Sequence, residues 1–310
     1  MHQPSPPFYP ILSMALIVSP ADGERLLHAL HIELGAQEPG FSLTTDRHTG
    51  ACVIRGSDEL HLRSICDRIS REYRIDIRVG ETQAILVETI RRSSEAEGKY
   101  IRQTGGSGNY GHVKIRLEPI EPGTGVEFID EIKSGVVPKE YIKPIEQGIR
   151  EAAQGGILAG FEVVDVRAIL YDGSFHETDS NEMAFRIAGS LAFREAATKA
   201  SPVILEPIMK FEFAVSEPQR IALIEEIRAR RGEVNLVEHS EGSLRVWAIA
   251  PLESMLGFHS PVPQARTFIG YREKPRPDAS DDEGGIPVSN PRKPGPRVNS
   301  TTVQADWDWT

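Results

Sequence analysis

The stretch TGGSGNYGHVKIRLEP, residues 104–119, decides how the middle of this chain folds. Gly106, Gly108 and Gly111 match the pattern G-x-G-x-x-G, and Val113 extends it to the glycine-rich loop that covers ATP phosphates in protein kinases. A dinucleotide site needs such glycines between a strand and a helix, so that the phosphates meet the helix N-terminus. Here the residues after Gly111 keep the two-residue alternation of a strand, which argues against a dinucleotide site.

A kinase loop does lie between two strands, but a kinase needs further motifs. The V-A-I-K lysine, the H-R-D loop and the D-F-G segment are all missing from the 310 residues, and so is the P-loop pattern G-x-x-x-x-G-K-[ST]. The glycines therefore predict a long connection between two strands rather than a nucleotide site.

Composition limits the class of protein. The length suggests two or three domains, and 39% hydrophobic residues are enough to build their cores. No apolar run approaches the roughly 20 residues that span a bilayer, so we expect a cytoplasmic protein without membrane contact. Cys52 and Cys66 stand among apolar neighbours and are predicted to be buried thiols. The net charge of −10 argues against indiscriminate binding to nucleic acid but leaves room for a local basic face.

Hydrophobic periodicity predicts the same plan twice. Within residues 10–80, a strand and a leucine-rich helix precede a hairpin at 41–56, a helix striped by Leu62, Ile65, Cys66, Ile69 and Tyr73, and a last strand at 74–80. Residues 205–271 repeat this βαββαβ order, which is the ferredoxin-like arrangement.

Residues 81–204 predict a third α+β domain between the two repeats. Strands are expected at 82–90, 111–119, 125–132 and 161–173. One helix is expected to carry Pro144 in its first turn, and a second to be capped by Asp179 with Glu182 and to run to Lys199. From residue 272 to 310 the chain is rich in proline and poor in aliphatic residues, which predicts a disordered tail.

Several segments carry a resemblance to a known family. The middle ones are EGKYIRQTGGSGNYGHVKIRLEPIEPGTGVEF, GVVPKEYIKPIEQGIREA and YDGSFHETDSNEMAFRIAGSLAFREAATKASPVILEPIMK, and they closely resemble domain IV of the bacterial translocase elongation factor G. GSDELHLRSICDRISREY resembles its domain III, and RARRGEV and APLESMLGF resemble its domain V. The resemblance covers about residues 10–270 and implies an α+β fold with a ribosomal-protein-S5-like domain between two ferredoxin-like ones.

The resemblance also implies a site and partners. In the family, the tip of domain IV enters the decoding region of the ribosome and contacts tRNA and mRNA, and domain V approaches the factor-binding region of the large subunit. The implied tip residues are Gln103, Thr104, Gly105, Gly106, Ser107, Gly108 and Asn109 in one loop, and His176, Glu177 and Asp179 in a second. The implied domain V loop holds Arg230, Arg231 and Gly232.

The resemblance starts at domain III, so the family's GTPase and β-barrel domains have no counterpart among these residues. We therefore expect a monomeric ribosome-binding protein, without cofactor, metal or catalytic residues, that acts in elongation or modulates it. Two alternatives stay open. The chain completes a separate translational GTPase in trans, or it is a degenerate paralog with little activity. Catalysis by His176 with Asp179 finds no nucleophile or metal-ligand set in support, and histidine reading RNA bases is the preferred interpretation.

The chain departs from the family at several positions. Ser107 and Asn109 stand where the family usually has arginine and glutamine, and Arg63 stands where it usually has glutamate. Loss of the arginine removes a strong phosphate contact from the tip. The end of the domain V region is also shortened. Lys133, Lys139 and Lys143 are either contacts to ribosomal RNA or part of a solvated face.

Overall fold

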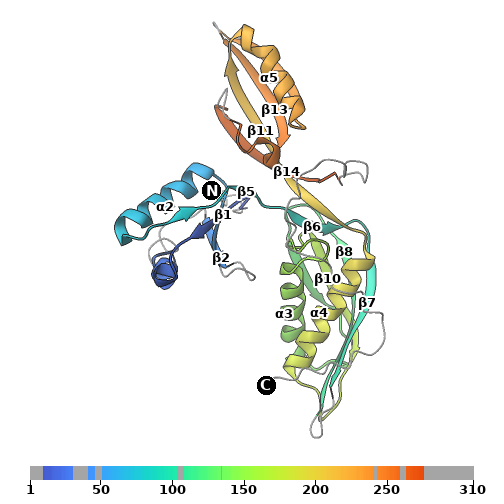
Figure 1. Ribbon diagram of the computed structural model, residues 1–310. Helices are drawn as coiled ribbons and strands as arrows, with labels where there is room; N and C mark the ends of the chain where they lie inside the picture. The colour runs from blue at the N-terminus through green and yellow to red at the C-terminus, as the bar shows by residue number, and fades with distance from the viewer. Residues whose placement is uncertain are drawn as a thin grey trace, which may run out of the picture. The chain divides into compact units, whose positions relative to one another are not determined.

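The computed structural model describes residues 10–30, 41–45, 51–102, 108–133, 135–240, 243–258 and 263–275. It contains three β-sheets, each with helices packed on it, as the ribbon shows (Figure 1). The fold is mixed α+β, as predicted. The predicted disordered tail lies almost wholly outside the described residues. Among those described, no helix has the length and apolar character needed to cross a membrane.

The N-terminal sheet has the predicted ferredoxin-like connectivity. Its strand order is β2-β3-β1-β4, and its strands pair antiparallel. The elements are β1 (Leu12–Ile17), the short 3-10 helix η1 (Pro20–Asp22), α1 (Gly23–His28), β2 (Phe41–Thr45), β3 (Cys52–Gly56), α2 (Glu59–Tyr73) and β4 (Arg78–Val79).

Helix α2 forms as its sequence predicts. The side chain of Asp58 accepts a hydrogen bond from the backbone N–H of Leu60 and so caps the helix. Leu62, Ile65, Cys66 and Ile69 make the buried stripe, while Arg63 points away and pairs with Glu59 one turn earlier.

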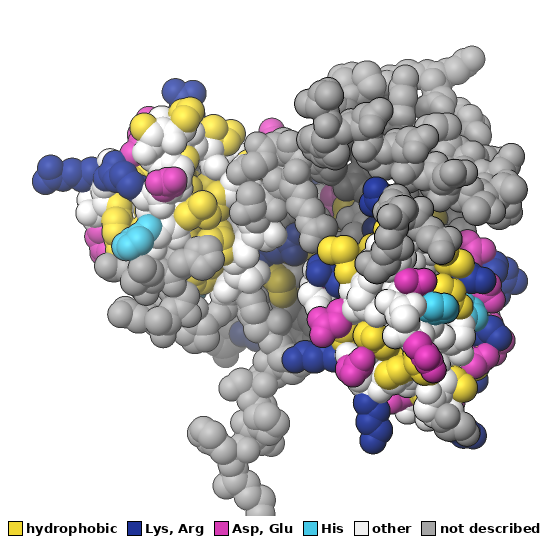
Figure 2. Space-filling view, turned by 90° about the horizontal axis from the view of Figure 1, so that it is seen from below, with side chains coloured by type: hydrophobic (Ala, Val, Ile, Leu, Met, Phe, Trp, Pro, Cys, Tyr) yellow, Lys and Arg dark blue, Asp and Glu magenta, His cyan; other side chains and the backbone are white. Residues whose placement is uncertain are grey.

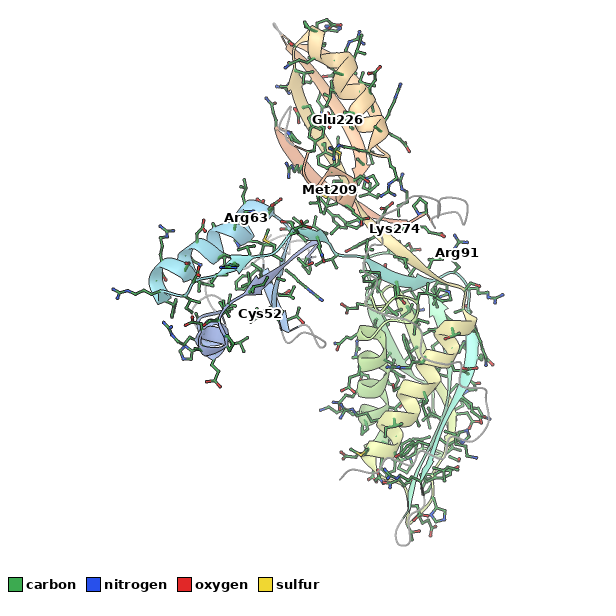
Figure 3. The ribbon with its side chains drawn as sticks, in the orientation of Figure 1. Cys52, Arg63, Arg91, Met209, Glu226 and Lys274 are labelled. Atoms are coloured by element: carbon green, nitrogen blue, oxygen red, sulfur yellow. The ribbon has the colours of Figure 1, made fainter. Side chains whose placement is uncertain are left out.

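Both cysteines are buried structural thiols. Burial raises the pKa of Cys52, on β3, and of Cys66, on α2, to about 11, so both stay protonated near neutral pH. Figure 3 marks Cys52 in this part of the chain.

The C-terminal sheet repeats the same connectivity with the strand order β12-β13-β11-β14. Its inward-facing residues include Met209, labelled in Figure 3, and Phe211 and Phe213. The elements are β11 (Pro202–Val215), α5 (Glu217–Ala229), β12 (Glu233–Ser240), β13 (Ser243–Pro251), α6 (Leu252–Met255) and β14 (Ala265–Glu273).

The prediction of one strand at 82–90 is wrong. The segment holds two short strands, β5 (Gln83–Ala84) and β6 (Val87–Ile90), and they join different sheets. β5 pairs with β1, whereas β6 pairs with the first residues of β11. Periodicity could not show this change of partner, because pairing with another strand is a tertiary property. The domain boundaries at 80/81 and 204/205 stay predictions.

The middle sheet has the order β7-β8-β10-β9 and is covered on one face by two helices (Figure 1). β9 and β10 run parallel and are joined by helix α3, while the other neighbouring strands are antiparallel. The elements are β7 (Ser94–Arg102), β8 (Asn109–Pro119), β9 (Val126–Asp130), α3 (Lys139–Gln154), β10 (Val166–Ser174) and α4 (Glu182–Lys199).

The predicted start of α3 is wrong. The helix begins at Lys139, directly after Pro138, so Pro144 lies inside it rather than in its first turn. A proline within a helix lacks the N–H that would bond to the carbonyl four residues earlier, so the helix forms with one bond fewer. Burial of Ile145, Ile149 and Ala152 against the domain core stabilises it despite that loss.

Glycines let α4 approach its neighbours very closely. A Cβ atom at Gly98 on β7 would overlap the carbonyl oxygen of Ala188, and one at Gly111 on β8 would lie 2.5 Å from that of Ala184. A Cβ atom at Gly189, within α4, would lie 2.7 Å from the carbonyl oxygen of Ile145 on α3. Gly111, the last glycine of the G-x-G-x-x-G pattern, is therefore a packing residue under a helix.

Replacing Gly98 with alanine is expected to lower the free energy of unfolding by about 1–3 kcal/mol, because the added methyl group must push α4 off the sheet. Urea unfolding followed by circular dichroism measures the effect. Gly23→Ala is the matched control, because a Cβ atom at Gly23 meets nothing within 4 Å. Equal stability of the two variants would contradict the tight packing.

Candidate functional site

The two predicted tip loops lie at one end of the middle sheet. The first joins β7 to β8 and the second, residues 175–181, joins β10 to α4. Of the predicted residues, Gln103, Thr104, Gly105, Gly106 and Ser107 lie outside the described part of the chain. Gly108 is buried and Asn109 half-buried, whereas His176 and Glu177 are exposed on the second loop.

Asp179 joins the two loops. Its carboxylate Oδ1 accepts a hydrogen bond from the backbone N–H of Gly108 at 2.8 Å, and its carbonyl oxygen accepts one from the N–H of Tyr110 at 2.7 Å. A Cβ atom at Gly108 would lie 3.0 Å from Asp179 Cγ, tighter than most real contacts, so this close approach favours glycine. Hydrogen bonds to a carboxylate are stronger than those between neutral groups, so this contact holds the loops together.

The prediction that Asp179 caps α4 is wrong, because Asn181 takes that role. Its Oδ1 accepts a hydrogen bond from the N–H of Ala184 at 2.9 Å, while its Nδ2 donates to Asn109 Oδ1 at 2.7 Å. One side chain thus caps the helix and links it to the first loop. Asparagine is among the best capping residues, so the sequence did contain a signal for this cap. The spacing from Asp179 to Glu182 matches a capping box and favoured Asp179 instead.

Ser174, at the end of β10, is a contact that sequence reasoning missed. Its hydroxyl lies 2.7 Å from Tyr110 Oη and 2.8 Å from His112 Nδ1. The Nε2 atom of His112 lies 3.6 Å from a carboxylate oxygen of Glu97 on β7. Ser174 and His112 are opposite residues in the β8–β10 pairing, so only the strand register shows that they meet. The hydrogen bonds of Ser174 therefore tie β8 to β10 below the loops.

His176 presents an exposed ring at the tip. The backbone N–H groups of Thr178 and Asp179 both point at its Nδ1, each at 3.3 Å. The Thr178 hydroxyl lies 3.1 Å and a carboxylate oxygen of Asp179 3.6 Å from the same nitrogen, so residues of the second loop surround this side of the ring. The side chain is 56% exposed, and its ring centre lies 6.4 Å from that of Tyr110. An exposed histidine ring can stack on a base and hydrogen-bond to its edge.

Arg231, in the predicted domain V loop, is held within the protein. Its Nη1 and Nη2 atoms donate to the two carboxylate oxygens of Glu206 at 2.8 and 2.9 Å, and Glu206 is fully buried. This bidentate pair neutralises a buried charge.

Arg230 is also engaged inside the C-terminal sheet domain. It donates to the carbonyl oxygen of Ser254 at 2.8 Å and to the carboxylate of Glu226, labelled on α5 in Figure 3. Its guanidinium group lies 5.4 Å from the centre of the Phe258 ring. Gly232 donates its N–H to the carbonyl oxygen of Ile227 and closes the turn. Ribosome binding by these three residues stays a prediction.

Two family models match the chain. Elongation factor G domain III matches residues 9–81, and elongation factor G domain IV matches residues 83–201. Both describe parts of a translation elongation factor, so the chain is elongation-factor-like. Because together they cover more than half of its residues, the chain belongs to the elongation factor G family.

A solved structure supports the same assignment. The crystal structure of a protein from Thermus thermophilus is 35% identical in sequence and superposes with a TM-score of 0.64. The similarity covers 89% of this chain and 42% of the Thermus protein, so the chain spans less than half of that relative.

Replacing Asp179 with alanine is expected to loosen the first loop where it meets the second. Hydrogen exchange at the Gly108 amide should become about tenfold faster or more, because a hydrogen bond to a charged acceptor contributes about 1.5–3 kcal/mol. Mass spectrometry or NMR measures the exchange. Thr178→Ala is the control, since the Thr178 hydroxyl contacts His176, on the second loop itself. Unchanged exchange at Gly108 would show that this bond does not join the loops.

Replacing Arg231 with alanine is expected to lower the free energy of unfolding by roughly 2–3 kcal/mol. The change leaves the buried carboxylate of Glu206 without its cation, and partial exposure of Arg231 keeps the loss below that of a fully buried pair. Thermal or urea unfolding measures it. Arg220→Ala, which breaks only an exposed pair with Glu217, should cost far less, and similar losses in both variants would contradict the prediction.

Proposed function

We propose that this chain binds the ribosome and acts in translation elongation or modulates it, with its two loops directed at RNA in the decoding region. One observation carries the proposal. The loops are held to each other by the Gly108–Asp179 and Asn109–Asn181 hydrogen bonds, while His176 stays exposed at their end. Membership of the elongation factor G family supports the same site.

The chemistry of the second loop suits unpaired RNA bases. Proteins read such bases by stacking aromatic side chains on them and by hydrogen bonds to their edges. His176 offers an exposed ring, and Phe175 beside it is also exposed. Asp179 and Ser180 hydrogen-bond to backbone N–H groups of the two loops, so less backbone ordering is needed when an RNA partner binds.

The proposed role is binding rather than hydrolysis. The family models that match are those of domains III and IV. Within the glycine pattern, Gly111 is engaged in packing and Gly108 in the contact to Asp179. We propose that the chain works in the cytoplasm as a monomer without a cofactor. The parts at 10–80, 81–204 and 205–271 would then act as counterparts of domains III, IV and V.

Cosedimentation with purified 70S ribosomes tests the proposal. The unmodified chain should pellet with ribosomes, and His176→Ala should weaken binding by about tenfold, since stacking on one base contributes about 1–3 kcal/mol. His28→Ala is the control, because His28 is another exposed histidine but lies on α1. Absence of binding at moderate salt, or equal binding by the His176 and His28 variants, would contradict the proposal.

A pull-down from cells tests the alternative in which the chain completes a separate GTPase. Recovery of ribosomal subunits supports direct ribosome binding. Recovery of a GTPase without ribosomal subunits would instead favour a chain that completes a separate translational GTPase in trans.

A further inference from the structure

Basic side chains in the middle sheet domain divide into paired and unpaired groups. Many form ion pairs within the domain, namely Lys114 with Asp172, Arg116 with Glu118, Arg150 with Glu146, Arg167 with Glu127, Arg186 with Glu151 and Lys199 with Glu195. Among the described residues of this domain, those without an ion pair are all exposed, namely Arg92, Lys99, Arg102, Lys133, Lys139, Lys143 and Arg194.

Two of these unpaired cations lie away from the tip. Arg194 stands in the last turns of α4, whose first turn is the one that meets the tip loops. Arg92 donates hydrogen bonds to the carbonyl oxygen of Lys199 at the end of the same helix. Neither is placed to contact RNA that meets the loops.

Arg102 and the lysines of α3 lie on either side of the tip. Arg102 ends β7 and stands opposite Asn109 in the β7–β8 pairing. The first turns of α3 lie beside the second loop, because Tyr141 donates a hydrogen bond to the carbonyl oxygen of Ser180 and its ring stacks on Phe185. Lys139 and Lys143 stand one turn apart on those turns. Figure 2, seen from below, shows basic side chains standing out at the margin of a face that also carries histidine and acidic side chains.

The position of the two lysines is unfavourable for the helix itself. The N-terminal end of a helix carries a partial positive charge and favours acidic side chains. Lys139 is the first residue of α3, and Lys143 follows at a spacing where like charges repel. Glu140 offsets only part of this. The helix itself therefore gives Lys139 no stabilising partner at this position, and the charges of Lys139 and Lys143 are available to an anionic group.

The charge of the rest of the chain makes such local cations necessary. With a net charge of −10, and with Glu177 and Glu182 exposed at the tip, the chain as a whole repels RNA. A cation that is not already paired with a carboxylate can bind an RNA phosphate without first breaking an ion pair, so such cations are the better candidates for this attraction.

We propose that Lys139, Lys143 and Arg102 contact phosphates of ribosomal RNA on both sides of the tip and supply the electrostatic attraction there. The inference rests on the proposed ribosome binding and adds to it the residues that carry the electrostatic part. An unpaired cation binds phosphate without first breaking an internal ion pair, and each contact releases a counterion.

The test measures binding of the full chain to purified 70S ribosomes over a series of KCl concentrations. The slope of log K against log salt becomes shallower by about 0.7–0.9 for each cation that no longer meets a phosphate. The Lys139→Gln/Lys143→Gln variant should therefore bind more weakly and show a slope shallower by about 1.5, and adding Arg102→Gln should flatten it by a further ~0.8. Circular dichroism checks that the variants fold.

Arg194→Gln/Lys199→Gln is the charge-matched control, because it removes two positive charges from the far end of α4. This control should keep the slope of the unmodified chain. If the unmodified chain fails to bind at any salt concentration, the proposed function fails and the inference with it. If the unmodified chain binds but the lysine variant shows the same salt dependence, the proposed phosphate contacts are wrong while ribosome binding stands. The same conclusion follows if the control variant shows an equally shallow slope.

Discussion

The tip depends on how closely α4 lies against its sheet. At Gly98 and Gly111 the helix backbone occupies the space where a side chain would stand, so the first turn of α4 meets β8 directly. That approach brings Asp179 and Asn181, which immediately precede the helix, within hydrogen-bond reach of Gly108 and Asn109. With a larger residue at Gly111 the helix would move outward, and these hydrogen bonds would no longer align the two loops.

A buried carboxylate, that of Glu88, fixes the C-terminal end of helix α3. Glu88 on β6 is fully buried and accepts hydrogen bonds from five consecutive backbone N–H groups, Ile157 to Phe161, at 2.6–3.2 Å. Converging backbone amides can stabilise a negative charge without a cation, which is why an unpaired glutamate is tolerated here. Glu88 thereby holds the connection from α3 to β10 in place, so α3 is anchored at its C-terminal end and meets the second loop at its N-terminal end.

Much of this fold could be predicted from the sequence. Its helices and strands each bury one face, and this leaves a periodic pattern of apolar residues. Both ferredoxin-like units and the stripe of α2 follow from periods of 2 and 3.6 residues. The failures have different causes. The division of 82–90 into β5 and β6 depends on partner strands that are distant in sequence. The start of α3 before Pro144 depends on burial of the helix against the domain core. The cap at Asn181 is a local contact with the N–H of Ala184, and it was missed because Asp179 and Glu182 match a capping box. The Ser174–His112 contact depends on strand register, which a single sequence does not display.

The two arginines of the predicted domain V loop show why residue type alone does not identify an RNA contact. A phosphate that draws Arg231 away must first replace its bidentate pair and leave the carboxylate of Glu206 buried without a cation, which costs several kcal/mol. Among the residues that the structure describes, Lys139 and Lys143 form no ion pair, so neither must break one to bind a phosphate. In a chain of net charge −10, the cations that contact RNA are therefore expected among those without an internal ion pair. An arginine that neutralises a buried acid, as Arg231 does, is a weaker candidate even though its loop resembles that of the family.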